Sequence, residues 1–291
     1  MTDRAASEPR VQAGAGGTTP ARALAKAEAE PPRRTRYRFD APVVYGLQQL
    51  RKTPKSTYNQ SITNWTTQIV GGRKEVAFED HHHNTTELIS FDPDTTELSV
   101  TSAGEVEIED NAGVLGPHHG NAPLWLYLMT TSRTEAGSGA RALIRDFNAP
   151  MDISDLHALS ERIRTAIPYT LGSSEPSWSA EDAISAAKGV CQDHTHVFIA
   201  CLRALSIPAR YVSGYLMLNE TTSQDAMHAW AEAFVEGLGW VGFDVSNGVS
   251  PDTRYVRVAT GLDYSDAAPI SGTRIGGANE ELHVRINVVQ Q

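Results

Sequence analysis

The pattern of hydrophobic and polar positions divides the chain into a β-rich first part and a mixed second part. From residue 35, short runs of β-type residues follow one another, and apolar side chains alternate with polar ones at Val76–Phe78 and Val106–Ile108. Pro54 and Gly71 separate these runs, as expected for turns. The pattern predicts an antiparallel β domain over residues 35–110.

The second part mixes helical periodicity with strands. Residues 111–150 form a connecting segment with a predicted short helix around 139–147, and residues 151–170 have a helical pattern. A further helix is predicted between Gly189 and Pro208, followed by strands at Ala209–Tyr215, Met227–Val235 and Trp240–Asp244. We therefore expect an α+β core over residues 151–291.

The first 34 residues differ in composition from the rest. They hold three large apolar side chains, Met1, Val11 and Leu24, among Ala, Gly, Thr, Pro and charged residues. Such a segment buries too little surface to offset the entropy of ordering, so residues 1–34 are predicted to be a disordered tail. The tail has no long apolar stretch of the kind that a secretory signal contains.

Charge excludes some classes of partner. The chain carries 35 acidic and 25 basic residues among 291, a net charge of -10, which argues against a nucleic-acid binder or a polybasic membrane-surface protein. The tail has six basic and four acidic residues, which leaves -12 on the rest and favours neutral or basic substrates. No run of 18 apolar residues occurs, so no membrane span is expected.

The two cysteines, Cys191 and Cys201, are predicted to lie on one helix. Ten residues span about 15 Å of helix axis, which is too far for a disulfide. A chain with free cysteines suits a reducing compartment, and we expect the cytoplasm.

Cys191 falls at the predicted start of this helix. Steps of about 100° place Phe198 and Leu202 close to its direction, so it faces the packed side. The helix N-terminus favours thiolate over thiol, and its free N–H groups could bind an oxyanion. Cys201 lies in mid-helix and is interpreted as core packing. A single cysteine is more often a small buried apolar residue, so a nucleophile needs a partner base.

A predicted hairpin supplies a base and a carboxylate. Period-two alternation places His228 and Glu232 on one strand face, and Gly237 and Gly239 mark the turn. With a three-residue loop over 236–238, His228 and Asp244 lie on the same face, one diagonal step apart. A four-residue loop would place them on opposite faces.

A zinc site is an alternative use of these residues. Cys191 and His194 are three apart on one helix, and His228 would be the third ligand. The histidine clusters His81–His83 and His118–His119 are expected at solvated loops or edges, because adjacent strand residues face opposite sides. We expect no metal, and no nucleotide-binding motif is present.

Several stretches together resemble the core of the bacterial transglutaminase-like family, which belongs to the papain-like cysteine-enzyme superfold. They are Gly189-Val-Cys-Gln-Asp193, Ala204-Leu-Ser-Ile-Pro-Ala-Arg-Tyr-Val-Ser-Gly-Tyr215, His228-Ala-Trp-Ala-Glu232 and Gly239-Trp-Val-Gly-Phe-Asp244. Residues 35–110 are similar to the family's N-terminal β region, and 261–272 resemble the segment after the core. His194 and Val245 depart from residue types common in the family.

The resemblance implies a helix carrying the cysteine packed on an antiparallel sheet. It implies Cys191 as nucleophile, His228 as base and Asp244 as the group that orients it, acting on amide, peptide or isopeptide bonds through a thioester. It favours hydrolysis, as in a peptidase or amidase. An amine-transferring transglutaminase and a non-catalytic peptide-binding module are the alternatives. A peptide or protein amide partner and no cofactor are expected.

Overall fold

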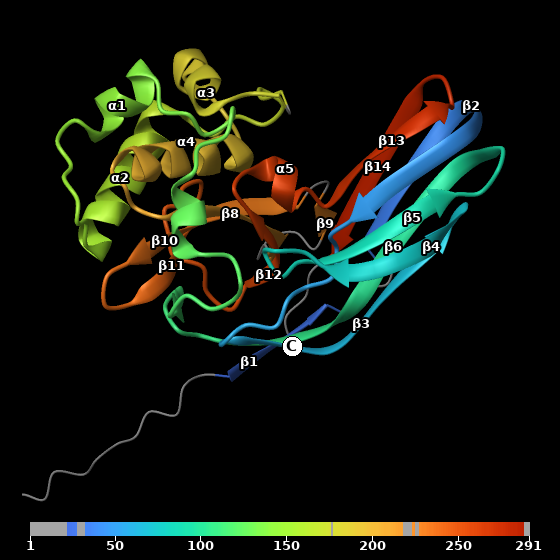
Figure 1. Cartoon of the computed structure of the whole chain (residues 1–291), viewed down its shortest axis with the longest axis horizontal. Helices are drawn as coiled ribbons and strands as arrows, with labels where there is room; N and C mark the ends of the chain where they lie inside the picture. Colours follow the sequence, from blue (N-terminus) through green and yellow to red (C-terminus); the bar gives the residue numbers. More distant parts are fainter. Residues whose placement is uncertain (1–21, 28–32, 176, 218–222, 225–226, 288–291) are drawn as a thin grey trace, which may run out of the picture.

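Two antiparallel sheets and one group of helices make up the fold (Figure 1). The computed structural model describes residues 22–27, 33–175, 177–217, 223–224 and 227–287. The four longer helices lie together over the second sheet, and the first sheet extends away on the other side. The separate sheets and helices confirm the predicted α+β class. Within the described ranges, no helix is long and apolar enough to cross a membrane.

The first sheet contains nine strands in the described part of the chain. They are β1 (Arg22–Ala27), β2 (Arg33–Leu50), β3 (Gln60–Val70), β4 (Gly72–Glu79), β5 (Thr85–Phe91), β6 (Thr95–Glu109), β9 (Ser223–Gln224), β13 (Ile270–Gly276) and β14 (Glu280–Asn287). Apolar side chains of β2, β5 and β6, among them Val43, Ile89 and Leu98, form one buried cluster. Burial of this alternating face stabilises the sheet.

The second sheet and the helices form the rest of the molecule. The strands are β7 (Val114–Gly116), β8 (Ala209–Leu216), β10 (His228–Val235), β11 (Gly239–Phe243) and β12 (Tyr255–Gly261), in the order β12-β8-β10-β11-β7. The helices are a 3₁₀ turn (Leu124–Leu128), α1 (Ser138–Ile144), α2 (Ile153–Ala166), α3 (Ala180–Ala186), α4 (Cys191–Ala204) and α5 (Tyr264–Ala267). Each helix and strand predicted between residues 139 and 244 is present, with shifts at its ends.

Helix α4 is the centre of the main core. Its residues from Asp193 to Arg203 are buried, and Phe198 and Leu202 are fully inaccessible. Ala229, Ala231 and Ala233 of β10 join the same cluster. Their small side chains let α4 pack closely on the sheet, while the intervening β10 residues point to the opposite face.

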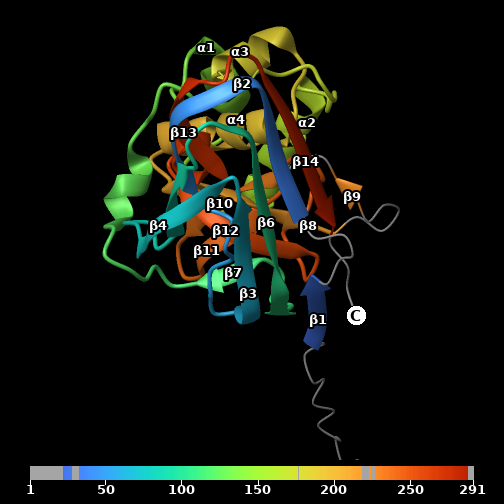
Figure 2. The ribbon, with the colours of Figure 1, turned by 90° about the vertical axis from the view of Figure 1, so that its right-hand side faces the viewer.

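The C-terminal strands correct the predicted domain boundary. Residues 151–291 were expected to form the core alone, but β13 and β14 return to the first sheet and pair with β2 (Figure 2). The connecting segment also contributes to the core, because β7 pairs with β11 and α1 packs on α4. Strand pairing over more than 200 residues depends on long-range hydrogen bonds that local patterns do not contain.

The predicted tail is ordered in part. Residues 22–27 form β1, which pairs with β6 along its whole length, and β2 begins at Arg33. Disorder was therefore the wrong expectation for these positions, because the edge of β6 offers backbone hydrogen bonds to a segment that has only one large apolar side chain, Leu24. Residues 1–21 and 28–32 of the predicted tail lie outside the described residues.

Candidate active site

The first residue of α4 is Cys191, which is half-buried. The Asp193 carboxylate fixes the turn that precedes it, because Oδ2 accepts the Val190 N–H at 2.8 Å and Oδ1 accepts the Ser174 hydroxyl at 2.9 Å. Gly189 makes this approach possible, since a Cβ there would lie 2.8 Å from the Asp193 Cβ. The sulfur is thereby held at a preorganised helix N-terminus.

The first turn of α4 also offers backbone donors. Within the described part of the chain, no acceptor bonds the backbone N–H of Cys191 or Gln192, whereas the His194 N–H donates to Val190 O at 3.1 Å. N–H groups at a helix start carry partial positive charge and can bind a developing oxyanion. The site therefore combines a thiol with donors for the oxygen of an attacked carbonyl.

His228 and Asp244 meet as the hairpin register predicts. Val235 pairs with Gly239, so the loop has three residues, and His228 Nε2 lies 2.6 Å from Asp244 Oδ2. Cys191 lies near enough for its charge to raise the pKa of His228. Since Nε2 bonds the carboxylate, Nδ1 is the ring nitrogen left for the sulfur.

Two further side chains hold the Asp244 carboxylate, which is fully buried. Oδ2 accepts the Tyr255 hydroxyl at 2.8 Å and Asn247 Nδ2 at 2.6 Å, and Oδ1 accepts the Asn247 backbone N–H at 3.2 Å. These donors favour the ionised carboxylate, as does His228. Although burial acts in the opposite direction, they lower the pKa of Asp244.

The charge state of His228 follows from its two neighbours. Burial alone would lower its pKa, but the charge of Cys191 and the hydrogen bond to Asp244 raise it to about 10. The imidazolium is thus stabilised between two groups that carry or can carry negative charge. Trp230 stacks beside the ring, with ring centroids 6.3 Å apart.

Tyr169 borders the site from the segment before α3. Its neighbour Thr170 donates its N–H to Gly189 O at 2.8 Å, which draws this segment alongside the start of α4. The ring is 47% exposed, and burial, together with the charges of Cys191 and Asp244, raises the pKa of its hydroxyl to about 12. The hydroxyl therefore stays protonated and remains a donor at neutral pH.

His194 has a structural environment that conflicts with the zinc alternative. It is fully buried, its Nε2 lies 2.7 Å from Ile167 O, and its Nδ1 lies 2.8 Å from Ser246 Oγ. Burial lowers its pKa, so the neutral ring donates from Nε2 and accepts at Nδ1. Because both nitrogens are occupied, His194 is not available to a metal beside Cys191, and it joins α4 to the segments that end α2 and follow β11.

Cys201 and His82 are buried outside the candidate site. Cys201 is fully buried in the main core, and burial raises the pKa of its thiol to about 12, in agreement with the packing interpretation. His82 is also buried, with Nδ1 3.2 Å from the Tyr127 hydroxyl, so the expectation of a solvated cluster was wrong there. Packing of the β4–β5 loop against the 3₁₀ turn decides this burial, and no local pattern records it.

The sequence predicted Cys191, His228 and Asp244 as site residues but did not single out Tyr255 or Asn247. Asn247 follows Asp244 by three residues, a spacing typical of a turn closed by an aspartate side chain, which is a usable signal. Tyr255 reaches Asp244 from β12, and only the strand order brings the two together.

Two family profiles match the sequence. Residues 141–245 match the transglutaminase-like superfamily, and residues 33–107 match the bacterial transglutaminase-like N-terminal region. An uncharacterized protein of Mycobacterium leprae is 25% identical over 278 residues, covering 88% of this chain and 96% of that protein. An uncharacterized protein of Mycobacterium tuberculosis is 34% identical over 163 residues, covering 50% of this chain and 52% of that protein.

Among solved structures, one from Cytophaga hutchinsonii, described as a "Putative Cysteine Protease", shares the fold. Its TM-score is 0.68 at 23% identity, and the alignment covers 94% of this chain and 91% of that one. The shared architecture spans both sheets and the helices. By the two profiles, residues 141–245 are a transglutaminase-like superfamily core, and residues 33–107 are the N-terminal region that precedes it in bacterial transglutaminase-like proteins.

Proposed function

We propose that Cys191, His228 and Asp244 form a catalytic triad that cleaves an amide or peptide bond through a thioester. The observation that carries this proposal is the 2.6 Å bond between the His228 imidazole and the buried Asp244 carboxylate, with Cys191 close enough for its charge to raise the pKa of the imidazole. A base oriented by a third group is the arrangement that activates a cysteine nucleophile. Membership of a superfamily with a cysteine-enzyme fold supports it.

In the first half of the reaction, the Cys191 thiolate attacks the carbonyl carbon of the amide. The carbonyl oxygen gains the negative charge, and the backbone N–H groups of Cys191 and Gln192 stabilise it. The C–N bond then breaks as the His228 imidazolium gives its proton to the leaving amine. The products of this half are a thioester on Cys191, a free amine and a neutral His228.

In the second half, His228 accepts a proton from an attacking nucleophile. Attack by water gives a carboxylic acid and restores the thiol, whereas attack by an amine gives a new amide. We propose hydrolysis, in line with the description of the Cytophaga protein that has the same fold. Transfer to an amine is the second candidate, because the Tyr169 side of the site is exposed and could admit one.

A cysteine nucleophile also bears on the cellular compartment in which the protein acts. A nucleophilic thiol must stay reduced, and both cysteines are free in the structure. We therefore propose the cytoplasm as the site of action, where thiols are kept reduced.

The test compares cysteine labelling in the full chain. Iodoacetamide should alkylate Cys191 at neutral pH at least about 100-fold faster than Cys201, because Cys201 is buried and its thiol is not ionised. Mass spectrometry of the peptides measures both rates. Equally slow labelling of the two cysteines would contradict the proposal and favour a non-catalytic peptide-binding module.

Activity is tested with a library of amides and peptides, with amine release as the readout. Cys191→Ala should abolish amine release, and Cys201→Ala is the matched control that should retain it. Added hydroxylamine separates the two outcomes of the thioester. A hydroxamate formed at the expense of acid shows an acyl-enzyme that an amine can reach, and acid alone indicates hydrolysis. Amine release that survives Cys191→Ala would refute the proposal.

A further inference from the structure

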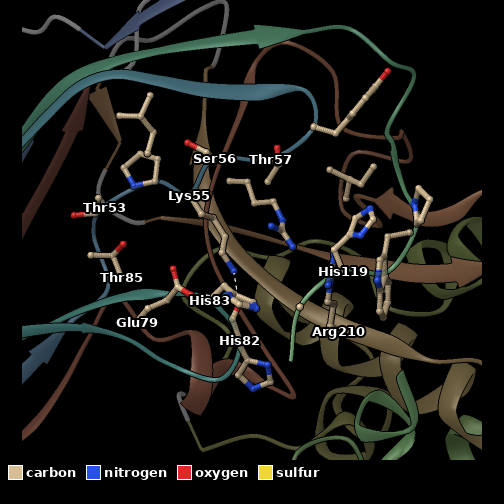
Figure 3. A pocket seen from close by; sticks show the side chains of 18 residues that line it. Thr53, Lys55, Ser56, Thr57, Glu79, His82, His83, Thr85, His119 and Arg210 are labelled. Carbon is tan, nitrogen blue, oxygen red and sulfur yellow. Dashed lines mark hydrogen bonds and ion pairs between the residues drawn. The ribbon is translucent and has the colours of Figure 1, made fainter. Parts of the chain in front are cut away.

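A cavity lies apart from Cys191, between the first sheet and the core. Its volume is about 580 Å³, within the range of small-molecule sites. The loop after β2 and the β4–β5 loop form one part of its wall, and β8, β11 and β12 contribute Arg210, Trp240 and Arg257. Figure 3 shows His119 and Arg210 on one side, Thr85 and Glu79 on the other, and Lys55 between them.

The wall is rich in buried basic groups that share one carboxylate. Arg257 forms a bidentate pair with Glu232 at 2.7 and 2.9 Å, and Arg210 Nε donates to the same carboxylate at 2.5 Å. Glu232 is fully buried, and although burial would raise its pKa, the two guanidinium groups lower it to about 2. Two fixed positive charges therefore face a single negative one.

Lys55 is a third basic group of the wall. Its Nζ donates to His82 O at 2.7 Å, Asn84 Oδ1 at 2.9 Å and Thr260 Oγ1 at 2.9 Å, so none of its three acceptors is a carboxylate. Burial, followed by repulsion from Arg257 and Arg210, lowers the pKa of Lys55 well below its usual range. An anion in the cavity would relieve this repulsion.

Among the described residues, some N–H groups of the Arg210 and Arg257 guanidinium groups have no acceptor. In the part of the chain that the structure describes, no acceptor bonds Nη1 or Nη2 of Arg210, or Nη1 of Arg257. The Arg210 guanidinium is held in place because its carbon lies 3.9 Å over the Trp240 ring. A planar cation fixed in this way with unused N–H groups matches a carboxylate or phosphate.

The cavity is preformed by contacts between its two sides. Gln60 Nε2 donates to Arg257 O at 2.8 Å and Gln60 Oε1 accepts the Arg257 N–H at 2.8 Å. Asn84 bonds Thr260 in the same reciprocal way, at 2.8 Å in each direction. Little ordering is therefore required of the protein when a ligand enters.

The acidic group and the histidines of the wall do not cancel this positive charge. Glu79 is paired with His83 Nδ1, so its carboxylate is already engaged by a wall residue. His82 and His119 add two imidazoles to the wall, and burial lowers the pKa of His82. Apolar wall atoms come from Ile62 and Trp240.

We propose that this cavity binds a small organic anion whose carboxylate or phosphate bonds the free guanidinium N–H groups of Arg210 and Arg257. The apolar body of the ligand packs against Ile62 and Trp240. The site is separate from Cys191, His228 and Asp244, and binding does not depend on the proposed hydrolysis.

The test is isothermal titration of the full chain with inorganic phosphate and, separately, with benzoate, at constant ionic strength set by chloride. Ser56→Glu and His119→Glu each place a carboxylate at an exposed position of the wall. Ser154→Glu, exposed at the start of α2 and outside this cavity, is the matched control. Far-UV circular dichroism verifies that the variants are folded.

Saturable binding of either anion to the wild type is expected, with affinity lowered at least about tenfold by Ser56→Glu and by His119→Glu and unchanged by Ser154→Glu. Binding of phosphate alone assigns a phosphate ligand, and binding of benzoate alone assigns a carboxylate. The proposal is overturned if neither anion binds the wild type, or if the two wall variants bind as the wild type does.

Discussion

Asp244→Asn isolates the charge of the carboxylate from its position. Three donors converge on Oδ2, from His228, Asn247 and Tyr255, so the amide oxygen of asparagine should occupy that place and leave the imidazole oriented as before. Only the negative charge is then removed. Two unit charges 4 Å apart interact by about 4 kcal/mol at an effective dielectric constant of 20, which is about 10³-fold in an equilibrium.

The assay is the rate of Cys191 alkylation by iodoacetamide at pH 6, which needs no substrate. An ordinary thiol ionises near pH 8.5, so about 0.3% of it is thiolate at pH 6, and this limits the slowdown to about 300-fold. We therefore expect Asp244→Asn to slow alkylation about 100-fold. Asp252→Asn is the control, because Asp252 pairs with Arg254 instead. Alkylation of Asp244→Asn within threefold of the wild type would refute the reasoning.

The remaining predictions concern pH and stability. The alkaline limb of the pH–rate profile on a hydrolysed amide should lie near pH 10, where His228 loses its proton, and Asp244→Asn should move it to lower pH because a charge that raises this pKa is gone. A limb near pH 7 in the wild type would contradict this. Glu232→Gln should cost about 3–5 kcal/mol in urea unfolding at pH 7, since two buried guanidinium groups lose their carboxylate. The pKa of Glu232 is about 2 in the folded chain and near 4.3 in the unfolded chain, so the ionised carboxylate contributes fully to the free energy of unfolding above pH 4.3. The difference in the free energy of unfolding between wild type and Glu232→Gln should therefore shrink as the pH falls toward 2. Glu161→Gln, at an exposed ion pair, should cost less than about 1 kcal/mol, and equal losses in the two variants would refute the burial argument. Tyr255→Phe should cost about 1.5–3 kcal/mol, because one hydrogen bond to a buried carboxylate is lost, and no loss in urea unfolding would show that this bond contributes nothing.

Short-range features of the sequence determined the helix–strand order of the core and its candidate triad. Gly189 and Pro208 bound α4, so Cys191 could be placed at a helix start. Period-two alternation and a glycine-rich turn placed His228 and Asp244 on one strand face, and the 2.6 Å contact between them agrees with that register. Both are local, because a helix start and a hairpin register are set within about 20 residues of chain.

Tertiary structure decided everything that joins distant segments. The return of β13 to the first sheet, the Tyr255 hydroxyl on Asp244 and the burial of His82 all depend on strand order and packing between elements. The basic cavity is the clearest case, because Lys55 and Arg257 are 202 positions apart in the sequence and neither belongs to a recognisable motif. Local patterns encode periodicity and turns, whereas the proximity of separate strands follows only from the hydrogen bonds and buried surface of the folded chain.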